Sequence, residues 1–516
     1  MGSSILQWSN HAWQYAPGGF TLLAIAVIPL LFLLQRLVFP KFDPREPPVL
    51  RPKIPVIGHL ISMARERTGL YRRLYRDNSL PICTLPMLNG KLYVINSPNL
   101  ISSAMRSKDL SFDPFVLEFI VNGLGIPGDQ ARKYTQPDTW QEFFDIIHDA
   151  LIGENLNKMV GSGLGCFASQ LNDIPPNTAT EIPDVSIWIR DMMFGSLMKS
   201  LYGEMNPMTV EGMHKLQDYE KKVAILALNL APKILAPRAL VARQRLKEIV
   251  MPFYAAQHDK GEDVSALIRD RASLQRRINI TDEAISRLEL IVPWAATTNT
   301  IPTTFWIFVH TLSRPEWAKR IRQEIEAIAV ITDNAAGRTA TINVPALRKE
   351  CPALLACFHE TNRLCNDITG NRRVVRDTIL QDPVEGKEYL LTKGTNVQWS
   401  CSVTQLDEKV WGPGSEQFDP SRWINNPSKK IAYRKSMIPF GGGKVLCPGR
   451  HLAEAEILGF LSGLVLGFEF EGVQVPKMED PLPGLGMKKL LWDGMDPGVT
   501  VRRRQGWEDV KLQFET

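Results

Sequence analysis

One cysteine, Cys447, lies in the glycine-rich segment Phe440–Arg450, which reads Phe-Gly-Gly-Gly-Lys-Val-Leu-Cys-Pro-Gly-Arg. This setting suits a thiolate that binds a haem iron, because glycines let the backbone pass close to a flat macrocycle and direct N–H groups at the sulfur. The competing interpretation is a buried structural cysteine in an ordinary turn before a helix.

A helix is expected directly after this loop. Apolar residues recur there at helical spacing, namely Leu452, Ile457, Phe460, Leu461 and Leu464. Pro448 would occupy the first turn, where its missing N–H costs nothing. The positive end of the helix would then point at Cys447, so we expect a lowered thiol pKa and a favoured thiolate.

A pair of opposite charges stands upstream of the loop in an apolar segment. Glu360 and Arg363 are three residues apart, so they share one helix face and can form an ion pair. Arg422, in the turn-rich segment Phe418–Trp423, supplies another positive charge. Taken alone, the pair would more often be an exposed pair on a helix surface.

The residues Phe440, Gly443, Cys447 and Gly449 match the pattern Phe-x-x-Gly-x-x-x-Cys-x-Gly. This pattern resembles the haem-binding signature of the cytochrome P-450 superfamily. The resemblance implies haem b as the cofactor and Cys447 as the axial thiolate ligand of its iron. It also implies that Phe440, Gly443 and Gly449 shape the haem-binding loop.

The upstream charges fit the same family in order and separation. The resemblance implies that Glu360, Arg363 and Arg422 form a buried charge network behind the haem. Such a network offsets its desolvation cost only if every member is satisfied. Arg372 matches the arginine that the family places near a haem propionate, with Arg373 as the alternative.

Two positions depart from the usual pattern of the family. Val445 stands where most members have an arginine that binds a propionate. On the oxygen-activating helix, Thr298 and Asn299 replace the usual acid and threonine that relay protons. An amide can hold a water molecule but cannot act as a carboxylate relay. Asn299, expected to face the haem, and Thr298 are therefore the candidate catalytic residues.

The segment Asn299–Trp306 is similar to the subgroup that contains cholesterol 7α-hydroxylase, sterol 12α-hydroxylase and prostacyclin synthase. Those members also lack the arginine beside the cysteine, and they include both oxygenases and an isomerase. Pro293 and Pro302 each remove a helical hydrogen bond, so we expect bends in this helix.

The composition indicates a globular protein with a large apolar core. Of the 516 residues, 44% are hydrophobic, and the formal net charge is +5, too small to indicate a nucleic-acid partner. The seven cysteines are irregularly spaced, which argues against a disulfide framework or a zinc site. They favour a reducing, cytosol-facing compartment.

The first forty residues predict a membrane anchor. The apolar stretch Phe20–Phe39 approaches the roughly 20 residues that cross a bilayer. No Lys or Arg precedes it, whereas Arg36, Lys41 and Arg45 lie within or just after it, so the remaining chain should face the cytosol. A cleaved signal peptide is the weaker alternative because no basic segment comes first.

The predicted organisation is an anchor at 1–40, with a transmembrane helix at about 20–39, a proline-rich linker at 41–55 and a haem-thiolate catalytic domain at 56–516. The fold class is mainly α with a minor β-sheet region, the cytochrome P-450 fold. Helical patterns cover 138–160, 211–226, 239–257 and 281–313. Strand patterns cover 91–95, 373–380 and 395–399.

The resemblance implies a membrane-bound monooxygenase of the endoplasmic reticulum that hydroxylates a hydrophobic small molecule, such as a sterol, terpenoid or meroterpenoid of secondary metabolism. Electrons would come from NADPH through a separate NADPH-cytochrome P-450 reductase, with cytochrome b5 as a second candidate donor. One alternative is a reductase-independent isomerase or dehydratase of a peroxide. The other is a non-catalytic haem-binding protein.

Overall fold

The computed structural model describes residues 27, 42–54, 57–88, 90–335, 337–425, 427–491 and 498–516. Apart from Val27, the predicted anchor lies outside these residues. Within the described ranges, no helix is both long and apolar enough to cross a bilayer. The chain divides into two compact units, Met1–Ser111 with Asn371–Trp399 and Phe112–Gly370 with Ser400–Thr516.

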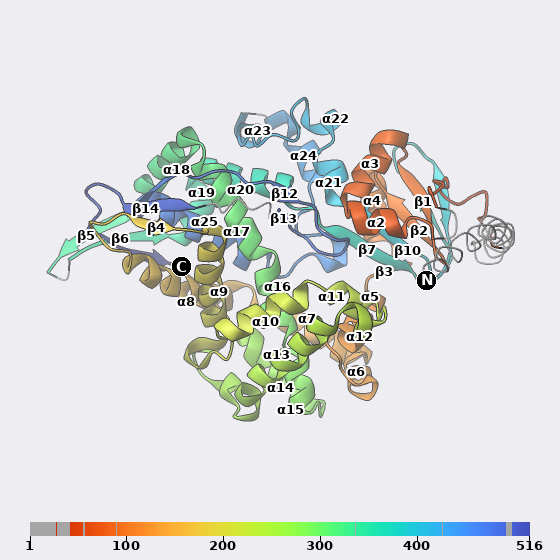
Figure 1. Ribbon diagram of the computed structural model, residues 1–516, viewed down its shortest axis with the longest axis horizontal. Coiled ribbons are helices and arrows are strands. Elements are labelled where there is room, and N and C mark those ends of the chain that lie inside the picture. Colours follow the sequence, from red (N-terminus) through yellow and green to blue (C-terminus); the bar gives the residue numbers. More distant parts are fainter. Residues whose placement is uncertain are drawn as a thin grey trace, which may run out of the picture. The chain divides into compact units, whose positions relative to one another are not determined.

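The first unit is built on a five-stranded sheet with the order β1-β2-β10-β7-β3 (Figure 1). β1 pairs antiparallel with β2, β10 runs parallel to β2, and β3 is antiparallel to β7. The strand predicted at 373–380 is two strands, β7 and β8. The elements are β1 (Ile82–Met87), β2 (Gly90–Ile95), β3 (Leu110–Ser111), β7 (Thr369–Val374), β8 (Thr378–Gln381), β9 (Glu388–Leu391), β10 (Asn396–Ser400), α2 (Leu60–Glu66), α3 (Gly69–Asn78) and α4 (Pro98–Arg106).

The second unit is mainly helical and carries three small sheets, β11-β14-β4, β15-β6-β5 and β12-β13. Its strands are β4 (Thr180–Ile182), β5 (Val330–Asn334), β6 (Gly337–Asn343), β11 (Phe468–Glu471), β12 (Met478–Glu479), β13 (Lys489–Leu490), β14 (Val499–Arg503) and β15 (Lys511–Glu515). Its helices up to residue 255 are α5 (Asp113–Glu118), η1 (Phe119–Gly123), α6 (Gly128–Tyr134), α7 (Pro137–Ala150), α8 (Gly153–Asn172), α9 (Val185–Tyr202), η2 (Gly203–Met205), α10 (Val210–Glu220), α11 (Val223–Ala227), α12 (Pro232–Leu235) and α13 (Pro237–Ala255). The later helices are η3 (His258–Lys260), α14 (Ala266–Arg277), α15 (Asp282–Leu288), α16 (Ile291–Thr298), α17 (Thr300–Leu312), α18 (Pro315–Ile328), α19 (Val344–Glu350), α20 (Pro352–Cys365), α21 (Cys401–Gln405), α22 (Glu408–Trp411), α23 (Ser421–Asn425), η4 (Pro427–Lys429), α24 (Lys430–Ser436), η5 (Gly443–Val445) and α25 (Arg450–Gly467).

Helix α17 lies at the centre of the second unit. It packs against α9, α18, α20 and α25, and its Trp306 and Phe308 are completely buried (Figure 1). The Trp306 indole Nε1–H donates to the carbonyl oxygen of Lys488 at 2.7 Å, so a buried polar group is satisfied by the strand region before β13. The mainly α prediction with a minor β-sheet is therefore confirmed for the described residues.

The helix predicted at 281–313 is three helices, α15, α16 and α17. One interruption begins at Glu289, four residues before Pro293, and the other falls after Thr298, four residues before Pro302. A proline cannot donate to the carbonyl four residues earlier and its ring clashes with that carbonyl. The two prolines therefore interrupt the helix where the sequence predicts bends, and the second interruption falls at Asn299.

Candidate active site

The loop around Cys447 owes its shape to glycines. Gly441 and Gly443 adopt φ values of +71° and +64°, which side chains with a Cβ rarely adopt. The Cys447 N–H donates to the carbonyl oxygen of Phe440 at 2.9 Å, which closes the loop. On the other side, the Arg450 guanidinium donates to the carbonyl oxygen of Cys447 at 3.0 Å. The backbone of Cys447 is thus held by a hydrogen bond at its N–H and by another at its carbonyl oxygen.

The thiol of Cys447 differs from the cysteines of the core. Cys447 and Cys166 are partly exposed, whereas the other five cysteines are buried. Burial raises the pKa of Cys357 and of Cys365 to about 12, which marks inert structural thiols. Cys447 instead has the N–H of Gly449 and the charge of Arg450 directed toward it, and both lower its pKa.

Two details of the predicted loop are wrong. The helix begins at Arg450, because the chain turns through Pro448 and Gly449 before it becomes helical, so Pro448 is not in the first turn. The net pKa of the Cys447 thiol is raised, since burial outweighs the Gly449 N–H and Arg450. A haem iron bound at Cys447 would supply the missing stabilisation of the thiolate, because a coordinating thiol is deprotonated outright.

The residues present fit a thiolate-bound haem. The loop offers one partly exposed cysteine, and Gly449 lies so close that a Cβ there would be 4.0 Å from Sγ. Elsewhere in the same unit, Ala295 and Asn299 are exposed although their neighbours are buried or partly buried, and they are one helical turn apart. These are the features that an apolar macrocycle needs: a ligand atom and a helix face left open to it.

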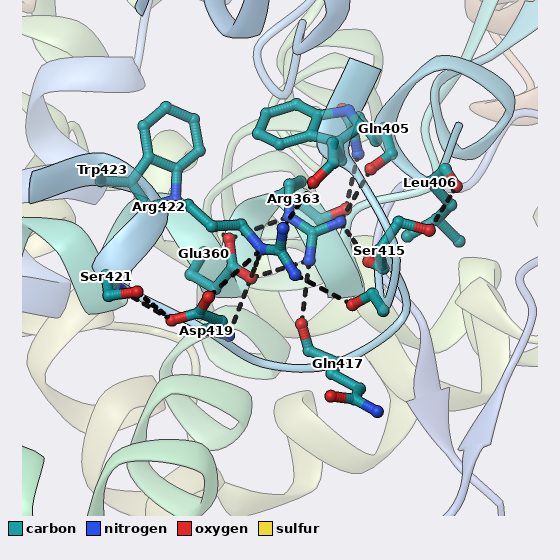
Figure 2. A network of polar contacts seen from close by, with 12 residues as sticks. Glu360, Arg363, Gln405, Leu406, Ser415, Gln417, Asp419, Ser421, Arg422 and Trp423 are labelled. Carbon is teal, nitrogen blue, oxygen red and sulfur yellow. Dashed lines mark hydrogen bonds and ion pairs between the residues drawn. The ribbon is translucent and has the colours of Figure 1, made fainter. Parts of the chain in front are cut away.

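The predicted charge network is present and buried (Figure 2). Both side chains of the pair Glu360 and Arg363 have no exposed surface, and they form two parallel hydrogen bonds of 2.8 and 2.7 Å. Arg363 also donates to the carbonyl oxygens of Gln405, Ser415 and Gln417 at 2.8, 2.5 and 3.1 Å. The guanidinium is therefore satisfied in every direction, as a buried charge requires.

Arg422 closes the network from α23. Its Nε lies 3.6 Å from Glu360 Oε1, and its other nitrogens donate to the carbonyl oxygens of Trp411 and Gly414 at 2.6 and 2.9 Å (Figure 2). The carboxylate of Glu360 also accepts from the Trp423 indole at 3.0 Å and from the backbone N–H of Asp419 at 2.9 Å. The sequence pattern did not identify these last two donors, although both lie in the segment 418–423 that supplied Arg422.

Thr298 and Asn299 point to different neighbours. Asn299 lies against Gly486, where an added Cβ would overlap its Oδ1. The Thr298 hydroxyl lies 3.4 Å from the Glu220 carboxylate, which forms an ion pair with Lys489. Glu220 carries no sequence signal that would have singled it out, because it is brought to the interruption by packing alone.

Arg372 and Arg373 belong to the first unit. Arg372 is the buried one of the two, 5% exposed, and its guanidinium lies 5.2 Å from the Trp399 ring and donates to the Asn371 carbonyl. Arg373 donates to Asn396 Oδ1 at 2.9 Å. Both of these Arg372 contacts are therefore with residues of its own sheet, on β7 and β10.

Comparisons with known proteins agree with this geometry. Residues 47–492 match the family model described as Cytochrome P450. A cytochrome P450 monooxygenase of Gibberella zeae is 30% identical over 503 residues, which cover 95% of each chain. The cytochrome P450 monooxygenase nodJ of Hypoxylon pulicicidum is 28% identical and covers 92% of each chain. The 7-alpha-hydroxycholest-4-en-3-one 12-alpha-hydroxylase of Oryctolagus cuniculus is 22% identical over 89% of this chain and 93% of its own. With a model match over most of its length and a thiol loop of the matching pattern, this chain belongs to the cytochrome P450 family.

Proposed function

We propose that this protein is a membrane-bound monooxygenase that hydroxylates an apolar small molecule, such as a sterol, terpenoid or meroterpenoid, with dioxygen and electrons from NADPH. Its family makes it an oxygen-incorporating oxidoreductase that carries haem b on a cysteine thiolate. When bound, the thiolate-ligated haem favours cleavage of the O–O bond of dioxygen. The observation that carries the assignment of the ligand to Cys447 is its position as a partly exposed cysteine in a loop whose backbone is hydrogen-bonded on both sides.

The protein's own residues have separate tasks in this proposal. Phe440, Gly443 and Gly449 shape the loop that holds the sulfur. Glu360 and Arg363, with Arg422, hold the polypeptide behind the cofactor. Arg372, the buried arginine of its pair, is the proposed partner of a haem propionate, since a guanidinium binds a carboxylate in bidentate fashion. Asn299 is proposed to hold a water molecule or an oxygen-bearing group at the open helix face.

The substrate class rests on relatives and on the apolar site. One relative is named as a 12-alpha-hydroxylase of 7-alpha-hydroxycholest-4-en-3-one. Phe119 and Leu485 are partly buried and pack against the apolar core of the second unit. An apolar substrate would complete such a surface.

Membrane attachment and an electron-donating partner are part of the same proposal. The segment between α11 and α13 exposes Leu228, Leu230, Ile234 and Leu235, each by more than half, which favours contact with lipid. With the apolar N-terminal stretch, this supports a location on the endoplasmic reticulum with the catalytic domain in the cytosol. Exposed basic residues at Lys429, Arg434 and Lys435 would attract an acidic NADPH-cytochrome P-450 reductase or cytochrome b5.

The test is reconstitution of the full-length haem protein with NADPH-cytochrome P-450 reductase in phospholipid vesicles. Sterols and terpenes that shift the haem spectrum are then incubated with NADPH and ¹⁸O₂. The expected product has gained one labelled oxygen atom, and formation requires both NADPH and dioxygen. Absence of any NADPH- and oxygen-dependent product across spectrally active ligands would overturn the proposal.

The second candidate is an isomerase or dehydratase of a peroxide. It is favoured by Thr298 and Asn299, because neither side chain is the acid that an oxygen-activating helix usually carries. Conversion of an apolar hydroperoxide without reductase, NADPH or dioxygen would support this candidate and reject hydroxylation. Binding of apolar ligands without any conversion would instead support a non-catalytic haem protein.

A further inference from the structure

Monooxygenation consumes protons. The balance is R–H + O₂ + 2e⁻ + 2H⁺ → R–OH + H₂O, so each turnover needs two protons at the site of reaction. The oxygen-activating segment α16–α17 presents Thr298 and Asn299 at its interruption, and neither ionises in the ordinary pH range. A proton source must therefore come from another element of the fold.

The hydroxyl of Thr298 differs in its contact from those of three other threonines of this segment. Thr297, Thr303 and Thr304 donate their hydroxyls to the carbonyl oxygens four residues earlier, at 2.7, 2.7 and 2.9 Å. Such back-bonding is the usual arrangement of threonine within a helix. The Thr298 hydroxyl instead faces an ionisable group, the Glu220 carboxylate, at 3.4 Å from Oε2. This separation is longer than that of a full-strength O–H···O bond, so the contact is a weak hydrogen bond.

Glu220 connects this hydroxyl with the solvent side. It is the last residue of α10, which packs against α16, and its other oxygen, Oε1, forms an ion pair with the Lys489 ammonium on β13. The exposed fraction falls from 42% for the Lys489 side chain to 12% for Glu220 and 7% for Thr298. The three groups therefore form a continuous line from water to the interruption of the helix.

We propose that Glu220 supplies protons to the oxygen-activating segment through Thr298, with Lys489 as its solvent-side partner. The Glu220 carboxylate takes a proton from water beside the Lys489 ammonium and passes it to the Thr298 hydroxyl, which releases its own proton toward the open face at Asn299; Glu220 is then a carboxylate again. No bond other than those to hydrogen changes. The inference rests on the monooxygenase function proposed above.

The test uses full-length haem protein with NADPH-cytochrome P-450 reductase in phosphatidylcholine vesicles and no added substrate. NADPH consumption, dioxygen consumption and hydrogen peroxide release are measured in H₂O and in D₂O. Glu220→Gln is expected to slow NADPH oxidation on the order of 10²-fold, as loss of a general acid does, and to raise the solvent isotope effect. Glu220→Asp should restore most of the rate, because it keeps a carboxylate at this position.

The matched control is Glu211→Gln on the same helix. Glu211 forms an exposed ion pair with Arg245 at 2.7 Å, so its loss removes a carboxylate from α10 without touching the interruption. This variant should oxidise NADPH like the wild type. Thr298→Val should reproduce the effect of Glu220→Gln, and the double variant should be no slower than either, because both remove one pathway.

A second measurement is independent of turnover. The unfolding midpoint in urea is measured for the ferric, substrate-free proteins. The midpoint of the double variant Glu220→Gln/Thr298→Val should shift by less than the sum of the shifts of the two single variants, because the two side chains are in contact. If Glu220→Gln does not retain haem, Thr298→Val carries the rate test alone, since it leaves all charges in place. Unchanged rate and isotope effect in a haem-loaded Glu220→Gln or Thr298→Val protein would overturn the inference. A wild type that consumes neither NADPH nor dioxygen, even with ligands that shift the haem spectrum, would instead overturn the proposed function.

Discussion

Replacement of Glu456 by glutamine should make the protein more stable at neutral pH. Glu456 lies on α25, nine residues after Cys447, and is 3% exposed. Neither of its carboxyl oxygens has a hydrogen-bond partner among the described residues. Its surroundings are Gly163 on α8 and Ser196 and Ser200 on α9, and burial raises its pKa from 4.5 to about 8.

The size of the effect follows from this shift. Between pH 4.5 and 8 the carboxyl is ionised in the unfolded chain and protonated in the folded protein, so folding takes up a proton. Stability then falls by about 1.4 kcal/mol for each pH unit across this window. Glutamine is neutral in both states and resembles the protonated acid. Glu456→Gln and the wild type should therefore be similarly stable near pH 5, and the variant should be more stable by about 3 kcal/mol at pH 7.

The assay is urea unfolding of the ferric haem protein between pH 5 and 8.5, followed by tryptophan fluorescence. Glu388→Gln, at an exposed position on β9, serves as the control and should follow the wild-type pH dependence. The difference between Glu456→Gln and wild type should grow with pH and level off above pH 8. Parallel pH curves for the two proteins would refute the assignment of a protonated, unpartnered carboxyl at this site.

Three further substitutions test the site. Cys447→Ala should abolish the thiolate-type absorption of the reduced, carbon monoxide-bound protein, and an unchanged spectrum would reject Cys447 as the ligand. Glu360→Ala strands the fully buried Arg363 at a cost of roughly 3–5 kcal/mol, so little haem-loaded protein should be recovered; normal haem content, measured by pyridine haemochromogen, would contradict this. Gly486→Ala should displace Asn299 and change product distribution as Asn299→Ala does; additive effects of the two changes would argue against a shared cause.

The sequence predicts the part of the site whose contacts join residues only a few positions apart in the chain. Glu360 and Arg363 are one helical turn apart, so their pairing follows from helix geometry, and their burial from the apolar residues around them. The interruptions before Pro293 and Pro302 follow from the missing N–H of proline. The burial of Glu456 could also be predicted, because it lies on the same face of α25 as Leu452, four residues earlier.

The remainder depends on contacts between distant segments. Glu220 is 78 residues from Thr298 and 269 from Lys489, and no local pattern indicates that the three meet. Trp423 reaches Glu360 across 63 residues. Such contacts are decided by how helices pack, which depends on the whole core rather than on a period in one segment. The thiol pKa was mispredicted for a similar reason: helix direction is local, whereas the burial that outweighs it is not.

Glu220 offers a physical reason why position 298, at the helix interruption, is a threonine and not an acid. A carboxylate at position 298 would face the Glu220 carboxylate at close range, and two like charges there would disfavour each other's ionised forms. A threonine avoids this conflict and still offers a hydroxyl that can carry a proton. Gly486, between β12 and β13, accommodates Asn299, and Lys489 on β13 binds Glu220, which in turn contacts Thr298. The acid absent from α16–α17 is thus matched by one at the end of α10, so the chemistry of this helix depends on three elements and cannot be understood from its own sequence.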